Sequence, residues 1–142
     1  TAIPKMDISS LPFLKLFDSA SRDFVSVGNK DSASLYVCGI TPYDATHMGH
    51  AATYIAFDLV HRYWAVSGLP VKFVQNITDI DDPLLVRASE RNLDWQKLAE
   101  GEIDLFREDM SALRVLPPHH YMGAVETIPL VIDAIEKLIK LK

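Results

Sequence analysis

Residues 35–75 constrain the fold most, because a short apolar run, an amphipathic stretch and a second apolar run follow one another there. The runs at 35–38 and 71–75 have the length and composition of buried strands. Between them, from about His47 to Val66, apolar residues recur every three or four positions, as along one face of a helix. A strand, a helix and a strand in this order form a βαβ unit, which requires a parallel sheet with the helix on one face. The sequence therefore predicts an α/β fold.

Residues that favour helix ends mark the limits of three helices. Asp44 or Thr46 could cap the first helix, and Gly68 stands where a helix end favours a left-handed residue. We expect Asp82 to cap a second helix, with a proline following at its first position. We expect a third, longer amphipathic helix to start at Asp94.

The segments on either side of this unit are less regular. Residues 1–34 read as an irregular arm with a short strand near 13–17. Two prolines after Leu116 break the chain before a last amphipathic helix, 125–142. That helix reaches Lys142 without a capping Gly or Asn, so we expect the native polypeptide to continue. These observations divide the chain into an arm, an α/β unit and a helical segment, at residues 1–34, 35–116 and 117–142.

Composition narrows the class of protein. The chain lacks an apolar run of the roughly 20 residues that a membrane span needs, and its first residues do not resemble a signal peptide, so we expect a cytoplasmic protein. A net charge of −5 argues against a large nucleic-acid surface. Cys38 is the single cysteine, so no internal disulfide can form.

A motif that can bind phosphate lies between the first strand and its helix. His47 and His50 stand three residues apart, on one side of the first helical turn, and Gly49 between them would let a ligand approach the backbone. Ligands of open α/β sheets bind at the carboxyl ends of strands, and a helix N-terminus there attracts phosphate. The sequence has neither a GxGxxG fingerprint nor a GxxxxGK[ST] loop, so the phosphate cradle must be of another kind.

The His-x-Gly-His motif resembles the signature of class I aminoacyl-tRNA synthetases. Taken alone it is weak, because two helical histidines are more often ordinary surface or core residues. Its flanks resemble the cysteine-activating branch of that family in order and spacing, over five segments: 35–39, 43–44, 57–60, 75–82 and 109–118. The resemblance implies the first half of a Rossmann-like class I synthetase catalytic domain at 35–116, with a helical connective subdomain starting at 117. It also implies that His47 and His50 bind ATP phosphates and stabilise charge during adenylate formation.

The resemblance also implies a zinc ion, one per subunit, bound by Cys38. In the cysteine-activating branch this zinc holds the substrate thiolate, which separates cysteine from serine. The remaining zinc ligands of the family come from sequence beyond this chain. Taken alone, Cys38 would more often be a buried structural thiol. His61, His119 and His120 do not match the family positions, and we expect them to be surface or loop residues.

Two departures from the tRNA synthetases point to a different acceptor. Where those enzymes typically have His-x-Gly-Asn-Ala-Arg, this chain continues with His50, Ala51 and Ala52. This run, the loop before it and residues 14–19 and 81–84 are similar to the cysteine:glucosaminyl-inositol ligases of mycothiol biosynthesis. The similarity implies ATP-dependent, AMP-forming ligation of L-cysteine to the amine of glucosaminyl-inositol through a cysteinyl-adenylate. An alanine in place of the arginine also suits a small sugar better than a polyanion.

The family's contacts, carried over by position, give a candidate binding set. The adenylate would contact Cys38, Gly39, Ile40, Thr41 and Thr53, and its amino-acid part would be lined by Asn76, Ile77 and Thr78. Alternatives remain open, because Thr53 could be a helix-surface hydroxyl, and Thr78 and Asp79 could cap a turn. Asp79, Asp81 and Asp82 could bind Mg²⁺, although capping of the next helix is expected for Asp82. ATP itself is expected to bring Mg²⁺.

Two other functions fit the same residues. The first is cysteinyl-tRNA synthetase, with tRNA as the acceptor. The second is an inert nucleotide- or metal-binding module, because the family's lysine-containing KMSKS-type loop and the other zinc ligands are absent from these residues. We therefore expect the 142-residue chain alone to be inactive. We expect the enzyme to bind ATP, L-cysteine and glucosaminyl-inositol. We also expect it to be a monomer that makes no contact with a membrane.

Overall fold

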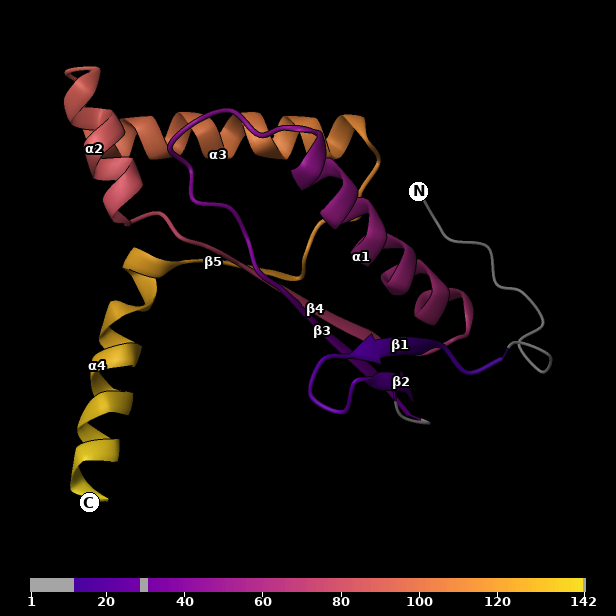
Figure 1. Cartoon of the computed structure of the whole chain (residues 1–142). Coiled ribbons are helices and arrows are strands. Elements are labelled where there is room, and N and C mark those ends of the chain that lie inside the picture. The colour runs from indigo at the N-terminus through magenta and orange to yellow at the C-terminus, as the bar shows by residue number, and fades with distance from the viewer. Residues whose placement is uncertain (1–11, 29–30, 142) are drawn as a thin grey trace.

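The computed structural model describes residues 12–28 and 31–141 (Figure 1). The chain forms a small hairpin, a parallel sheet and four helices. In order these are β1 (Lys15–Asp18), β2 (Asp23–Ser26), β3 (Ala33–Val37), α1 (Met48–Val66), β4 (Val71–Ile77), α2 (Asp82–Glu90), α3 (Trp95–Ala112), β5 (His120–Gly123) and α4 (Ala124–Lys140).

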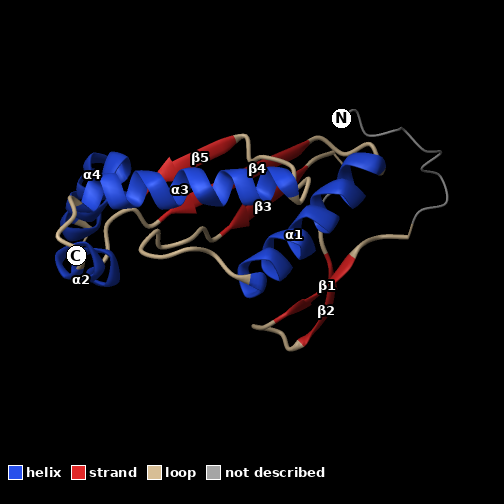
Figure 2. Cartoon of the chain, turned by 90° about the horizontal axis from the view of Figure 1, so that it is seen from above, coloured by secondary structure: helices blue, strands red, loops and turns tan. Residues whose placement is uncertain are grey.

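The central sheet has three parallel strands in the order β3-β4-β5. Leu35 pairs with Phe73 across the first ladder, and Asn76 pairs with Met122 across the second. Helix α1 connects β3 to β4, which confirms the predicted βαβ unit and the α/β class. Helices α1 and α3 lie on the same side of the sheet (Figures 1 and 2). All three strands therefore end at the same edge of the sheet.

The main core forms between this sheet face and the two helices. Strand β3 alternates between buried and exposed residues, with Leu35 and Val37 pointing inward. They join Phe73 of β4, Trp64 of α1 and Phe106 of α3, among others, in one cluster. Such alternation is what a strand with one covered face requires. Trp64 is 5% exposed in this core.

The structure adds two features that the sequence did not predict. The arm forms an antiparallel hairpin, β1–β2, whose turn holds Arg22 at φ 56°. Strand β2 was missed because all four of its residues are exposed, which leaves no apolar pattern. Strand β5 was missed because it has only four residues and begins two positions after Pro118. Since β5 pairs with β4, the sheet extends beyond the boundary expected at residue 117, and the division into domains stays a prediction.

Two helix starts differ in detail from expectation. Helix α1 is capped by His47, not by Asp44 or Thr46, which make contacts with other helices. Helix α2 is capped by Asp81, one residue before the expected Asp82. The cap of α3 by Asp94 is confirmed, and so is the left-handed Gly68 at the end of α1, with φ 77°.

Helix α4 confirms the predicted last helix but packs differently from the others. Its first turn follows β5 directly, and the helix then leads away from the sheet (Figure 1). None of its described residues is buried, and Leu130, Leu138 and Ile139 are each about two-thirds exposed. Among the residues that the model describes, no helix has the length and apolar character to span a membrane.

Candidate functional site

Two chain segments meet at the carboxyl edge of the sheet and are joined by hydrogen bonds. The Gly39 N–H donates to Oδ1 of Asn76 at 2.9 Å, and the Thr78 N–H donates to the carbonyl oxygen of Ile40 at 3.0 Å. The segments approach so closely that a Cβ atom at Gly39 would lie 1.6 Å from the carbonyl oxygen of Asn76. Glycine is therefore required at this position. The two halves of the predicted binding set, 38–41 and 76–78, do lie side by side.

The predicted contacts within these segments divide into core and edge residues. The side chains of Ile40 and Ile77 are buried, so any ligand contact there is left to their main chains. Cys38 is exposed and Thr41 and Thr78 are half-buried at the edge. The alternative of a sealed structural thiol at Cys38 is therefore wrong. An exposed thiol beside the strand ends is available to a metal or a substrate.

Tyr54, a residue that the sequence analysis did not assign to the site, also belongs to it. Its hydroxyl donates to the carbonyl oxygen of Cys38 at 3.1 Å. The side chain is buried and packs edge-on against Phe106, with 5.0 Å between ring centroids. Burial raises the pKa of Tyr54 to about 12, and the neighbouring Cys38 adds to this, so the hydroxyl remains a donor at neutral pH. The available signal was its spacing, one helical turn after His50.

The two histidines form a pair at the tip of α1, with 4.2 Å between ring centroids. Nδ1 of His47 accepts from the Gly49 N–H at 3.0 Å, and Nδ1 of His50 accepts from the His47 N–H at 3.2 Å. A neutral imidazole that accepts at Nδ1 carries its proton on Nε2. The hydrogen bonds therefore assign both rings the tautomer with an Nε2–H donor. Together they cap the helix and present two N–H groups at its positive end.

The surroundings of the two histidines affect the pKa of His50 and the space available to the ring of His47. Burial lowers the pKa of His50, and the charge of a protonated His47 lowers it further, so His50 is neutral at pH 7. A Cβ atom at Gly49 would lie 2.8 Å from Cε1 of His47. The glycine therefore makes room for the His47 ring itself, whereas the sequence suggested room for a ligand.

Helices α2 and α3 hold the loop that leads to the histidines. Asp44 pairs with Arg87 and, at 3.4 Å, with Arg91, and the hydrogen bond from Arg87 lowers the pKa of Asp44. The Thr46 hydroxyl donates to Oδ2 of Asp109 at 3.0 Å. Arg87 and Arg91 keep part of their side chains exposed while they make these ion pairs. These contacts depend on tertiary structure, so sequence spacing gave no signal for them.

The acidic residues after β4 act as helix caps. Oδ1 of Asp79 accepts from the Val125 N–H at the start of α4, and Oδ1 of Asp81 accepts from the Asp82 N–H, each at 2.9 Å. Within the described ranges, no group of three or more His, Cys, Asp or Glu residues is arranged to hold a metal. The alternative of a magnesium cluster there has no support. Cys38 fits zinc by chemistry and exposure, but a zinc site needs further ligands.

The other histidines lie away from this edge. His61 is buried against Phe73, with 5.5 Å between ring centroids, so the expectation of a surface residue is wrong for His61. Burial lowers its pKa, and the charge of a protonated His119 acts in the same direction. Nδ1 of His119 accepts from the Phe73 N–H at 3.0 Å, where β4 begins its pairing with the residues before β5.

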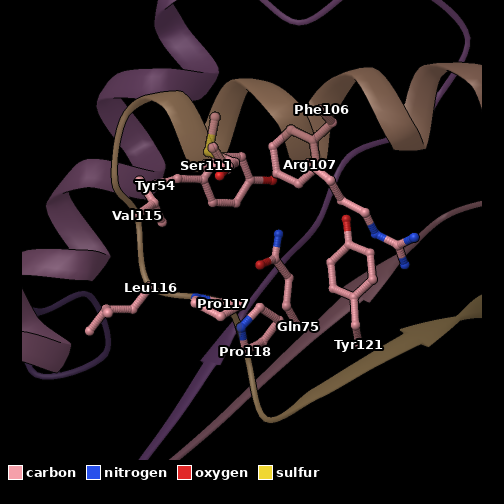
Figure 3. Close-up of a pocket in the computed structure, with 11 residues that line it drawn as sticks. Tyr54, Gln75, Phe106, Arg107, Ser111, Val115, Leu116, Pro117, Pro118 and Tyr121 are labelled. Atoms are coloured by element: carbon pink, nitrogen blue, oxygen red, sulfur yellow. The ribbon is translucent and has the colours of Figure 1, made fainter. Parts of the chain in front are cut away.

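A cavity of about 350 Å³ lies between α1, α3 and the sheet, behind Tyr54 (Figure 3). Gln75 is buried in its floor, and in the described part of the chain neither its Nε2 nor the Tyr121 hydroxyl has a hydrogen-bond partner. Burial raises the pKa of Tyr121, and the Arg107 guanidinium lies 4.8 Å from the centre of its ring. The wall is completed by Phe106, Met110, Ser111, Val115, Leu116, Pro117 and Pro118.

Comparison with known proteins places these features in a family. Residues 24–142 match the family described as tRNA synthetases class I (C) catalytic domain. A ligase of Paenarthrobacter aurescens (strain TC1), named L-cysteine:1D-myo-inositol 2-amino-2-deoxy-alpha-D-glucopyranoside ligase, is 58% identical over 130 residues, covering 92% of this chain and 31% of that protein. Ligases of the same name from Mycobacterium sp. (strain KMS) and Micrococcus luteus are each 59% identical, covering 90% and 89% of this chain and 31% and 30% of their own lengths.

The extent of these matches has two consequences. The chain spans about 31% of the length of the curated relatives it matches, so it corresponds to one part of each of them. The family match itself covers most of the chain, including both strands and the helix that form the site. The chain therefore belongs to the class I (C) tRNA synthetase catalytic domain family.

Proposed function

We propose that this chain is the ATP-binding first part of an AMP-forming ligase that joins L-cysteine to the amine of glucosaminyl-inositol. The observations that carry the proposal are an exposed thiol, Cys38, directly after β3, and two imidazole donors at the tip of α1, the helix that follows this strand. The names of the relatives supply the substrates, because each is called a ligase of L-cysteine and this amino sugar.

The reaction has two steps. An oxygen of the cysteine carboxylate attacks the α-phosphorus of ATP, which forms cysteinyl-adenylate and releases pyrophosphate. The amine of the sugar then attacks the carbonyl carbon, which forms an amide and releases AMP. The Nε2–H groups of His47 and His50 would donate to phosphate oxygens whose charge increases in the first transition state. The start of α1 supplies its dipole at the same place.

Zinc is proposed as the group that selects cysteine. Cys38 would be one of its ligands, and the others would come from the part of the protein outside this chain. A bound zinc ion prefers a substrate thiolate to a hydroxyl, so it can distinguish cysteine from serine where an apolar pocket cannot. Mg²⁺ would accompany ATP as its counter-ion.

The acceptor distinguishes the proposal from its nearest alternative, a cysteinyl-tRNA synthetase. Ala52 stands two residues after His50, and the chain carries a net charge of −5, which suits a small neutral or cationic acceptor better than a polyanion. The family description names tRNA synthetases, so a cysteinyl-tRNA synthetase is the second candidate function. We propose a cytoplasmic monomer that acts on small molecules.

The test offers both acceptors to the full-length protein, that is, the polypeptide at the length of its relatives. With ATP and L-cysteine present, glucosaminyl-inositol is expected to give a cysteine–sugar amide and AMP, identified by mass spectrometry. Cysteinylated tRNA without the sugar conjugate would instead establish the tRNA synthetase. The 142-residue chain alone should show no cysteine-dependent pyrophosphate–ATP exchange, because its described residues offer zinc one thiol and no three-ligand group.

A further inference from the structure

We propose that Tyr54 is a positioning residue that fixes the peptide group after Cys38 and so holds the thiol in place for the metal and the substrate sulfur. The inference rests on the proposed function. Tyr54 does not touch substrate in this scheme. It acts through the main chain of Cys38.

The peptide group between Cys38 and Gly39 is held at both ends by side chains. Its carbonyl oxygen accepts from the Tyr54 hydroxyl at 3.1 Å, and its N–H donates to Oδ1 of Asn76 at 2.9 Å. The two partners come from different elements, α1 and β4. A planar peptide with both polar atoms engaged cannot rotate without breaking a bond. Its plane fixes ψ of Cys38, which in turn limits the directions open to the Cys38 side chain.

Tyr54 is itself held rigidly. Its side chain is 5% exposed, and its ring packs edge-on against Phe106 of α3. It lies four residues after His50, on the same face of α1. One rigid helix therefore carries both a phosphate donor and the group that orients the thiol. The distance between the bound sulfur and the α-phosphate would then be set within a single element, which favours in-line attack.

The helix also offers a matched control. The Tyr63 hydroxyl, nine residues further along α1, donates to the carbonyl oxygen of Pro12 in the N-terminal arm. Tyr54→Phe and Tyr63→Phe thus remove the same atom from the same helix, and each frees one backbone carbonyl. Nine residues correspond to roughly 13 Å along a helix axis, so Tyr63 lies well away from the tip.

The experiment compares the full-length protein with its Y54F and Y63F variants. Zinc affinity is measured by competition with a chromophoric chelator, and the KM values for L-cysteine and for ATP are measured by pyrophosphate–ATP exchange. Loss of one part-buried hydrogen bond to the Cys38 carbonyl predicts that Y54F weakens zinc binding and raises the KM for cysteine, each by about tenfold. The KM for ATP should stay within about twofold. Y63F should leave all three values unchanged.

Two results would overturn the inference. One is a Y54F protein with wild-type zinc affinity and wild-type KM for cysteine. The other is a Y54F protein in which the KM for ATP rises as much as the KM for cysteine, since general loosening of the fold would do that. If the wild-type protein shows no cysteine-dependent exchange, the proposed function fails, while the comparison of zinc affinities still decides the role of Tyr54.

Discussion

Each histidine at the tip of α1 uses its two ring nitrogens for different purposes. Nδ1 accepts from a backbone N–H and completes the helix cap, while Nε2 is left to donate outward. The cap therefore fixes the tautomer that the proposed phosphate contact requires. The capping role of Nδ1 and the donor role of Nε2–H can be separated by substitution, because other residues cap helices well but have no Nε2–H.

His47→Asn should separate the two roles. Asparagine is among the best N-cap residues, so the free energy of unfolding should change by less than about 0.5 kcal/mol. The rate of cysteine-dependent pyrophosphate–ATP exchange by the full-length protein should fall by about 10²–10³, the cost of losing one donor to a charge-rich transition state. His47→Ala serves as the comparison and should lose about 1 kcal/mol of stability as well. Near-wild-type exchange in the asparagine variant would show that His47 only caps the helix.

Burial of His61 makes stability depend on pH. Its pKa is lowered in the folded state, so the unfolded chain binds more protons as the pH falls below about 6.5. The free energy of unfolding should therefore decrease from pH 7.5 to pH 5.5. His61→Gln cannot titrate and should lose less stability over this range, as measured by urea unfolding of the chain at both pH values. His50, with the same sign of shift, remains in both proteins. An equal decrease in the two proteins would contradict the prediction.

At this scale the sequence predicted the strand end before Cys38 and the helix start at His47 and His50, because strand ends and helix starts follow from local patterns. It did not predict the contacts that these segments make. The hydroxyl of Tyr54 on Cys38 and that of Thr46 on Asp109 join residues 16 and 63 positions apart. Such bonds depend on how the elements pack, which no local pattern contains.

Among the elements, the long periodic helices were predicted, whereas two of the four-residue strands, β2 and β5, were not. Helices α1, α3 and α4 each have 17 residues or more, enough for an apolar stripe to stand out. Strands β2 and β5 have four residues each, and their burial gives no clear alternation. A strand of this length is defined by the partner to which it hydrogen-bonds, and for β5 that partner, β4, lies more than 40 residues earlier.

Alanine substitutions at two glycines should change the stability of the chain in opposite directions, because Gly39 lies against a neighbouring segment and Gly101 does not. Gly39→Ala would place a Cβ atom 1.6 Å from the carbonyl oxygen of Asn76, so the chain should lose more than about 3 kcal/mol or fail to fold. Gly101→Ala, within α3, meets no described atom within 4 Å and should gain about 0.5–1 kcal/mol from helix propensity. Urea unfolding of both variants provides the test. A G39A chain as stable as wild type would mean that the two segments are not in contact.

In the described part of the chain, helices cover one face of the central sheet, and the other face carries exposed side chains. Helices α1 and α3 cover the first, while Tyr36, Val74 and Met122 line a depression on the second beside the first turn of α4. Tyr36 is 63% exposed. Together with the apolar side of α4, this is far more exposed apolar surface than scattered single residues would give.

The open apolar surface predicts that the 142-residue chain associates with itself in solution. Sedimentation at micromolar concentration should give a mass above the 15.9 kDa of one chain. Ile135→Asp together with Ile139→Asp places charges on the exposed apolar side of α4 and should restore the mass of one chain. Glu136→Gln, also on α4, is the control and should not. A wild-type chain that sediments as a single copy would refute the prediction.

The contact between Asp79 and the start of α4 links the binding edge to the most exposed part of the molecule. Asp79 directly follows Thr78, and its carboxylate accepts from the Val125 N–H at 2.9 Å. Strand β5 ends beside the same point, so α4 has little freedom to shift without pulling on the turn after β4. A displacement of α4 would therefore be passed to the turn that contains Thr78 through a single carboxylate.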